Sequence, residues 1–116
     1  MVSENKNDCV TRAISLGANL PYSTVRRKLF FTAKLMDCPK LCPTCYCFLI
    51  HDVLGGVPKN CTIQGKQMTV EEFADNYPIG TFLVRMNGHI STVIDNCIFD
   101  SWDCRQHLLT NAWQMR

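Results

Sequence analysis

Apolar residues near the start of the chain recur every three or four positions, as they do on one face of a helix. Between residues 8 and 19 this face consists of Val10, Ala13, Ile14 and Gly17. Asp8 stands where an N-terminal cap is expected, and Gly17 to Asn19 stand where a helix commonly ends. The pattern therefore predicts a first helix with Cys9 in its first turn.

Residues 21–36 predict a second helix. The positions spaced for its buried side are Tyr22, Val25, Leu29 and Ala33. The basic triplet Arg26, Arg27 and Lys28 falls mostly outside that side. Such a triplet is more typical of a solvated helix face than of a phosphate site.

Prolines and cysteines interrupt the helical pattern between residues 37 and 47, "DCPKLCPTCYC", which predicts a compact cysteine-rich loop. A shorter helical segment is expected over residues 48–56, ending at a pair of glycines. Thr69 and Glu72 have the spacing of a capping box, so another short helix should follow and end near Pro78.

Strand patterns appear in the last third of the chain. The segments "TFLVRM", "HISTVI" and "CIFDSW", which begin at residues 81, 89 and 97, are separated by the turn pairs Asn87-Gly88 and Asp95-Asn96. We therefore expect a single α+β domain over residues 1–116. In it, the helix that carries Cys9 packs on a small antiparallel sheet.

The two-residue turns fix which side chains share a face of this sheet. With Asp95 and Asn96 in the loop, Ser91 opposes Asp100, and Asp100 becomes a diagonal neighbour of His89. Asp95 would lie at the far end of the strand and Asp103 on the opposite face. We expect the first helix to cover the face that His89 shares with Phe82, Val84, Met86, Val93, Ile98 and Trp102.

This arrangement would bring a thiol at a helix start to a histidine held by a carboxylate. The helix dipole and an adjacent imidazolium both favour the thiolate, so Cys9 is a candidate nucleophile with His89 as base and Asp100 as orienting residue. The N–H of Cys9, with Asn7 or Asn5, could stabilise an oxyanion. Taken alone, such a cysteine is more often a buried packing residue, and such a histidine a surface residue.

The composition of the chain indicates what class of protein it is but says little about the reaction it could catalyse. A net charge of +2, with 19% charged and 47% hydrophobic residues, gives no general attraction to nucleic acid or membrane. The polar N-terminus and the absence of a long apolar run favour a cytoplasmic protein, in which the eight cysteines stay reduced.

The cysteine-rich loop contains the zinc candidates Cys38, Cys42, Cys45 and Cys47, which His51 or Cys61 could supplement. It has one CxxC pair where a firm zinc signature needs two, so we expect a reduced loop with no metal or cofactor. Cys61, Cys97 and Cys104 are interpreted as packing residues, and His51 and His107 as ordinary.

The stretches "NDCVTRAI" and "GHISTVIDNCIFDSWD", together with "PIGTFLVRMNGH" and "NAWQ", resemble small papain-like cysteine peptidase proteins of bacteriophages and mobile elements. More distantly they are similar to bacteriocin-processing peptidase domains. The resemblance covers both ends of the chain but not the middle. It implies a papain-like fold, a catalytic triad of Cys9, His89 and Asp100, and a peptide or protein substrate.

Three hypotheses follow. The first is a cysteine peptidase, a hydrolase that cuts a peptide, isopeptide or other amide bond through a thioester. The same triad could instead transfer the acyl group to another acceptor. Because Ser3 stands where papain-like enzymes usually carry an oxyanion-hole glutamine, the alternative is an inactive binding module, phage-encoded and directed at a host protein in the host cytoplasm.

Overall fold

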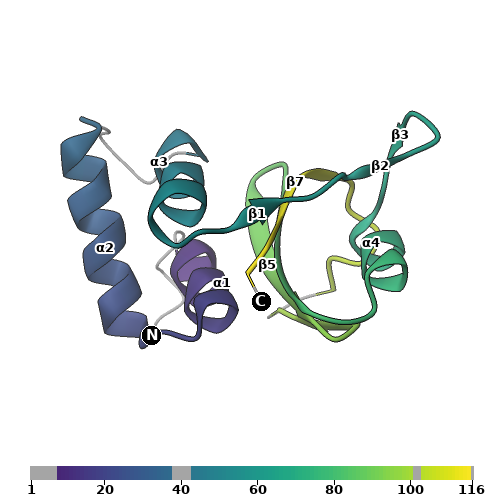
Figure 1. Cartoon of the computed structure of the whole chain (residues 1–116), viewed down its shortest axis with the longest axis horizontal. Coiled ribbons are helices and arrows are strands. Elements are labelled where there is room, and N and C mark those ends of the chain that lie inside the picture. The colour runs from purple at the N-terminus through teal and green to yellow at the C-terminus, as the bar shows by residue number, and fades with distance from the viewer. Residues whose placement is uncertain (1–7, 38–42, 101–102, 116) are drawn as a thin grey trace.

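Helices lie on both sides of an antiparallel sheet in the computed structural model, which describes residues 8–37, 43–100 and 103–115 (Figure 1). The helical elements are α1 (Asp8–Ala18), α2 (Tyr22–Leu35), α3 (Pro43–Phe48), the π-helix η1 (Leu49–Val53) and α4 (Val70–Asn76). None of the helices in these residues is long and apolar enough to span a membrane. The α+β class predicted from the sequence is confirmed.

Within the described residues, five strands form the main sheet in the order β1-β7-β4-β5-β6, with all neighbours antiparallel. Their bounds are Val57–Pro58 for β1, Thr81–Met86 for β4, His89–Ile94 for β5, Cys97–Phe99 for β6 and Leu109–Gln114 for β7. A separate hairpin contains β2 (Thr62–Ile63) and β3 (Lys66–Gln67). The strands predicted from residues 81 and 89 are confirmed. The strand predicted over residues 97–102 is confirmed for Cys97–Phe99 and ends before Asp100, and residues 101–102 lie outside the described residues. Strand β7 is an addition that pairs with β4.

The sheet separates two hydrophobic clusters, as alternating side chains on buried strands require. One cluster joins α1, α2, α3 and η1 to Leu83, Ile90 and Trp113. The other joins α4 and the segment before β7 to Phe82, Val84 and Met86. Figure 1 shows α4 on the side of the sheet away from α1 and α2.

Two contacts hold α1 close to the sheet. A Cβ atom on Gly17 would lie 2.8 Å from Cδ2 of Leu83, so the helix and β4 approach more closely than any larger residue allows. The hydroxyl of Thr92, fully buried on β5, donates to the backbone oxygen of Ala13 at 2.8 Å. Asn19 has a positive φ of 57° just after α1, where the sequence predicts its end.

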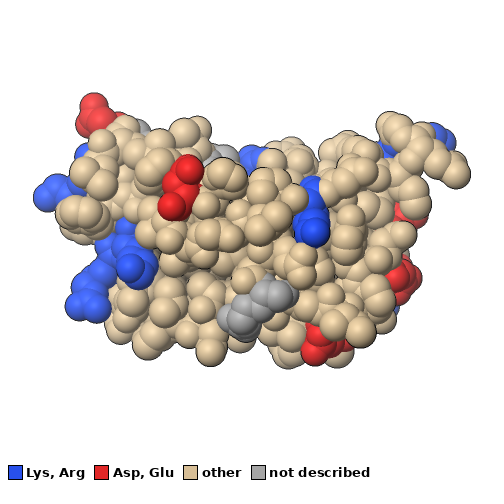
Figure 2. Space-filling view, viewed as in Figure 1, with Lys and Arg blue, Asp and Glu red and all other residues tan. Residues whose placement is uncertain are grey.

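The second predicted helix is confirmed as α2, but its buried side is shifted. Val25 and Leu29 are buried, together with Thr32, whose hydroxyl bonds to the oxygen of Lys28 at 2.7 Å. The expectation that Tyr22 is buried is wrong, since the first residue of the helix remains 39% exposed. Arg26 and Arg27 are exposed, and Figure 2 shows Lys and Arg side chains gathered at the end of the molecule where α2 lies.

Part of the predicted cysteine-rich loop is helical. Residues 43–48 form α3 and continue directly into η1, so the loop prediction is wrong for this part, and residues 38–42 lie outside the described residues. A proline is tolerated in the first turn of a helix, which is where Pro43 stands. The capping box at α4 is confirmed. Thr69 Oγ1 accepts from the N–H of Glu72, and the carboxylate of Glu72 accepts from the N–H of Thr69.

The predicted register is confirmed, but the predicted cover is wrong. Met86 pairs with His89 and Val84 with Ser91, as the Asn87-Gly88 turn requires. However, α1 packs on the opposite face, that of Leu83 and Ile90. The face of Phe82, Val84 and Met86 is already filled by α4 and by residues leading into β7, which local sequence patterns do not assign to either face. Trp102 lies outside the described residues.

The close approach of α1 to β4 predicts that a larger residue at position 17 destabilises the fold. Gly17→Ala should lower the free energy of unfolding by about 1–3 kcal/mol, the usual cost of overpacking, despite the better helix propensity of alanine. Urea denaturation measures this change. In a Leu83→Ala background the same substitution should cost much less, because the atoms that it would meet are gone. Equal costs in the two backgrounds would contradict the proposed contact.

Candidate active site

The thiol of Cys9 lies where the first turn of α1 crosses the beginning of β5. The Cys9 side chain is half-buried, and the backbone N–H of Ile90 donates a hydrogen bond to its sulfur. At the first turn of a helix the backbone N–H groups have no partner within the helix, so the local potential is positive. Both features favour a negatively charged sulfur.

Strand pairing explains why the N–H of Ile90 faces the thiol. In a two-residue hairpin the residues next to the loop, Met86 and His89, exchange backbone hydrogen bonds, so the next residue, Ile90, directs its N–H away from β4. On that side, among the residues that the structure describes, β6 pairs with β5 from Thr92 to Ile94 and no further. The short edge strand thus leaves the backbone of Ile90 available to Cys9.

His89 is the first residue of β5 and contacts both other members of the site. Its Nε2 donates to Oδ2 of Asp100 at 2.6 Å, in a setting where the two side chains are only 10% and 6% exposed. Because Asp100 engages Nε2, the hydrogen bond of His89 with Cys9 is assigned to the other ring nitrogen, Nδ1. The structure therefore brings together Cys9, His89 and Asp100 in that order.

The other two aspartates of this region lie elsewhere. Asp95 is in the β5–β6 loop with a φ of 47°, and its Oδ1 accepts from the N–H of Gly80 at 2.9 Å. Asp103 is exposed and pairs with Arg105 at 2.9 Å. Asp100 alone among these three bonds to His89, as the register predicts.

Hydrogen bonding shifts the pKa values of the thiol and the imidazole in opposite directions. The hydrogen bond to His89 lowers the pKa of Cys9 against the opposing effect of burial, and the charge of His89, the Ile90 N–H and Arg12 add to the lowering. The pKa of His89 is raised, first by the hydrogen bond with Cys9 and then, against burial, by Asp100. Both shifts favour a thiolate–imidazolium pair.

Cys104 belongs to the site although the sequence indicates only a packing residue. Its buried thiol donates to Oδ2 of Asp100 at 3.3 Å, so that oxygen accepts from both Cys104 and His89. Burial, and then the Asp100 carboxylate, raise the pKa of Cys104 to about 11, which keeps it a protonated donor. Its position four residues after Asp100 could have indicated this role.

Tyr46 of α3 is a second neighbour that sequence reasoning missed. Its hydroxyl oxygen accepts from Nε of Arg85 at 2.9 Å. Burial raises the pKa of Tyr46 against the lowering effect of Arg85, and the charges of Cys47 and Cys9 add to the rise, so the phenol lies within electrostatic reach of the thiol. It remains protonated at neutral pH.

The zinc candidates do not meet in the described part of the chain. No group of three or more metal-ligating side chains is found there, although Cys38 and Cys42 lie outside it. Cys45 is buried with its thiol directed at the oxygen of Leu29, and the exposed His51 contacts Asp52 at 3.2 Å. Cys61 is buried as expected, whereas Cys97 is exposed and does not pack.

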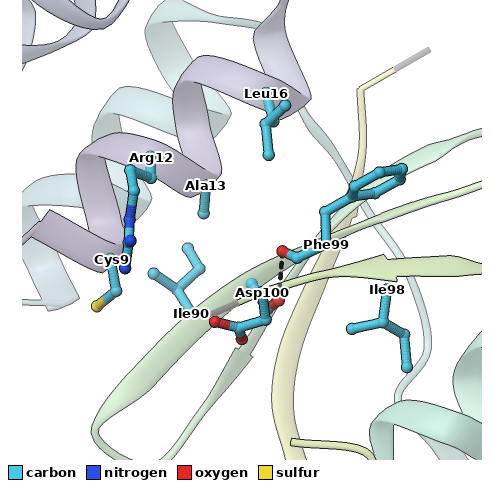
Figure 3. Close-up of a pocket in the computed structure, with 9 residues that line it drawn as sticks. Cys9, Arg12, Ala13, Leu16, Ile90, Ile98, Phe99 and Asp100 are labelled. Carbon is cyan, nitrogen blue, oxygen red and sulfur yellow. Dashed lines mark hydrogen bonds between the residues drawn. The ribbon is translucent and has the colours of Figure 1, made fainter. Parts of the chain in front are cut away.

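A pocket of about 380 Å³ opens beside the thiol, between α1 and β6 (Figure 3). Cys9 and Asp100 both line it, together with Arg12, Ala13 and Leu16 from α1 and Phe99 at the end of β6. A reacting group could therefore reach the sulfur from this side. The oxyanion candidates Asn5 and Asn7 lie outside the described residues.

Comparison with known proteins identifies no relative of this chain. No protein-family model, curated protein or solved structure matches the chain. The assignment of the site therefore rests on its geometry.

The two acidic positions of the β5–β6 hairpin provide a matched test. Asp100→Ala should slow alkylation of Cys9 by iodoacetamide at pH 7 by about tenfold, the size expected when one charge-assisted hydrogen bond to His89 is lost. Asp95→Ala removes a carboxylate from the same hairpin that accepts from the N–H of Gly80 rather than from His89, so it should leave the rate nearly unchanged. Peptide mass spectrometry measures both rates, and equal effects would refute the assignment of Asp100.

Proposed function

We propose that the protein is a papain-like cysteine peptidase or amidase that cleaves an amide bond through a thioester on Cys9. The observation that carries this proposal is the position of His89, which contacts the thiol with one ring nitrogen and Asp100 with the other. A nucleophile, a base and a group that orients the base are the minimum for this chemistry. The resemblance noted in the sequence assigns the same roles to the same three residues.

The acylation step follows from the contacts. Nδ1 of His89 accepts the thiol proton, and the sulfur of Cys9 attacks the carbonyl carbon of the substrate to form a tetrahedral oxyanion. When the oxyanion collapses, the C–N bond breaks and the imidazolium gives its proton to the leaving amine. The products are a free amine and a thioester between the acyl group and Cys9.

Deacylation uses the same residues with water as the nucleophile. His89 takes a proton from water, the resulting hydroxide attacks the thioester carbon, and the sulfur leaves and recovers the proton as a thiol. The acid is released and the free enzyme returns. Transfer of the acyl group to an amine acceptor would differ only in the nucleophile of this step.

Asp100 and the start of α1 supply the electrostatic stabilisation. The carboxylate accepts from Nε2 of His89, which holds the ring in the tautomer that presents Nδ1 to the thiol and stabilises the imidazolium. The N–H of Cys9, without a partner inside the helix, is suited to donate to the oxyanion. Asn7 or Asn5 remains the proposed side-chain donor.

A peptide library tests the proposed reaction. Tryptic peptides with blocked α-amines are incubated with the native protein, and each new amine found by mass spectrometry marks a cleaved amide bond. Native protein should generate new amines, and Cys9→Ala should reduce their rate of formation at least about a thousandfold. The matched control is Cys97→Ala, which removes an exposed thiol outside the site and should cleave like the native protein.

Two results would overturn the proposal. Cleavage that persists in Cys9→Ala would assign the activity to other residues. A folded native protein that cleaves none of the peptides would favour the alternative, a binding module that keeps the fold without turnover.

A further inference from the structure

Two large apolar side chains are exposed on facing elements next to the candidate active site. Leu16 of α1 is 44% exposed and Phe99 of β6 is 46% exposed, and both line the pocket that contains Cys9. Figure 3 shows Leu16 extending from the helix toward the end of β6 where Phe99 lies. Apolar surface concentrated in one concave site is typical of ligand pockets, because its burial by a ligand is favourable.

The polar side chains that line the pocket are Arg12, Ser91 and Asp100, and hydrogen bonds within the protein engage two of them. The hydroxyl of Ser91 donates to the backbone oxygen of Phe99 at 3.2 Å, the contact drawn in Figure 3. Asp100 accepts from His89 and Cys104. A polar occupant would lose its hydrogen bonds to water and find these groups committed, whereas an apolar occupant loses none.

The size of the pocket restricts what can enter it. A volume of about 380 Å³ is near the lower end for ligand sites, which suits a single large side chain and its flanking backbone rather than a whole small domain. The remaining walls include Ala13 and Ile98, which are apolar. Because Cys9 lines one end of the same pocket, a substrate whose side chain fills the pocket would have its backbone near the thiol.

We propose that this pocket is a specificity subsite that binds an apolar side chain of the substrate, of leucine to phenylalanine size, next to the bond cleaved at Cys9. The role of the pocket as a substrate subsite rests on the proposed function, but its affinity for apolar groups can be measured without any turnover. The preferred substrates would be peptides or amides with such a side chain adjacent to the scissile bond.

Two alkylating probes of equal length test the subsite. N-hexyl iodoacetamide and N-(5-hydroxypentyl) iodoacetamide have the same reactive group and differ in a terminal methyl or hydroxyl. The ratio of their rates at Cys9, divided by the same ratio for N-acetylcysteine, reports the preference of the pocket alone. We expect native protein to favour the hexyl probe by about tenfold, the cost of burying a hydroxyl without a partner.

Substitutions locate the preference. Leu16→Gln and Phe99→Gln should each reduce the ratio toward one, because each replaces an apolar wall with an amide. The matched control is Ile79→Gln, which replaces a side chain that is 80% exposed and does not line the pocket, so the ratio should stay at its native value. A native ratio near one, or a high ratio that survives both pocket substitutions, would overturn the subsite.

The same data separate failure of the subsite from failure of the proposed function. Fast labelling of Cys9 near neutral pH with a ratio near one would contradict the subsite alone. Slow labelling with a ratio near ten would support the pocket as an apolar binding site and contradict the reactive thiol.

Discussion

The packing of α1 across the beginning of β5 determines where the Cys9 thiol lies, and the rest of the site depends on that contact. Gly17 permits the close approach to Leu83, and the Thr92 hydroxyl ties the helix to β5 through the oxygen of Ala13. Both contacts lie further along the helix than Cys9. They fix the axis of the helix, so its first turn can hold the sulfur against the N–H of Ile90.

A short edge strand is the second constraint. If β6 continued to pair with β5 beyond Thr92, its backbone would occupy the position that Cys9 takes beside Ile90. The end of β6 at Phe99 releases the chain so that Asp100 can turn toward His89. One interruption of the ladder therefore opens the edge of β5 to the thiol and supplies the carboxylate.

Charge in the site is distributed along a line of hydrogen bonds. The Asp100 carboxylate is buried, which is costly for an isolated charge, but its Oδ2 accepts from His89 and from the Cys104 thiol. Cys104 stays protonated because burial and the same carboxylate raise its pKa to about 11. The pKa values of the two thiols in the site are thus shifted in opposite directions, that of Cys9 downward by His89 and that of Cys104 upward by burial and Asp100.

Local rules were sufficient for the features that meet in the site. The spacing of apolar residues placed Cys9 in the first turn of α1, and the two-residue turns fixed the register that puts Asp100 rather than Asp95 beside His89. Helix and turn signals of this kind act over a few residues. They survive in the folded protein because tertiary packing agrees with them.

Longer-range choices could not be obtained in this way. Which face of the sheet α1 covers depends on what fills the other face, and α4 with the segment leading to Leu109 fills it. The place of β7 beside β4 is likewise set by contacts between distant segments. The helix α3 forms where prolines and cysteines indicated a loop. Its proline, Pro43, stands in the first turn, where a proline does not interrupt a helix.

The rate of iodoacetamide labelling at Cys9 as a function of pH tests whether His89 activates the Cys9 thiol. The thiolate is the reactive form, so the rate follows the titration of the thiol. Because His89 lowers the pKa of Cys9, labelling of the native protein should reach half its maximum below pH 9.0, and His89→Ala should move that midpoint upward. An unchanged midpoint in His89→Ala would contradict the account.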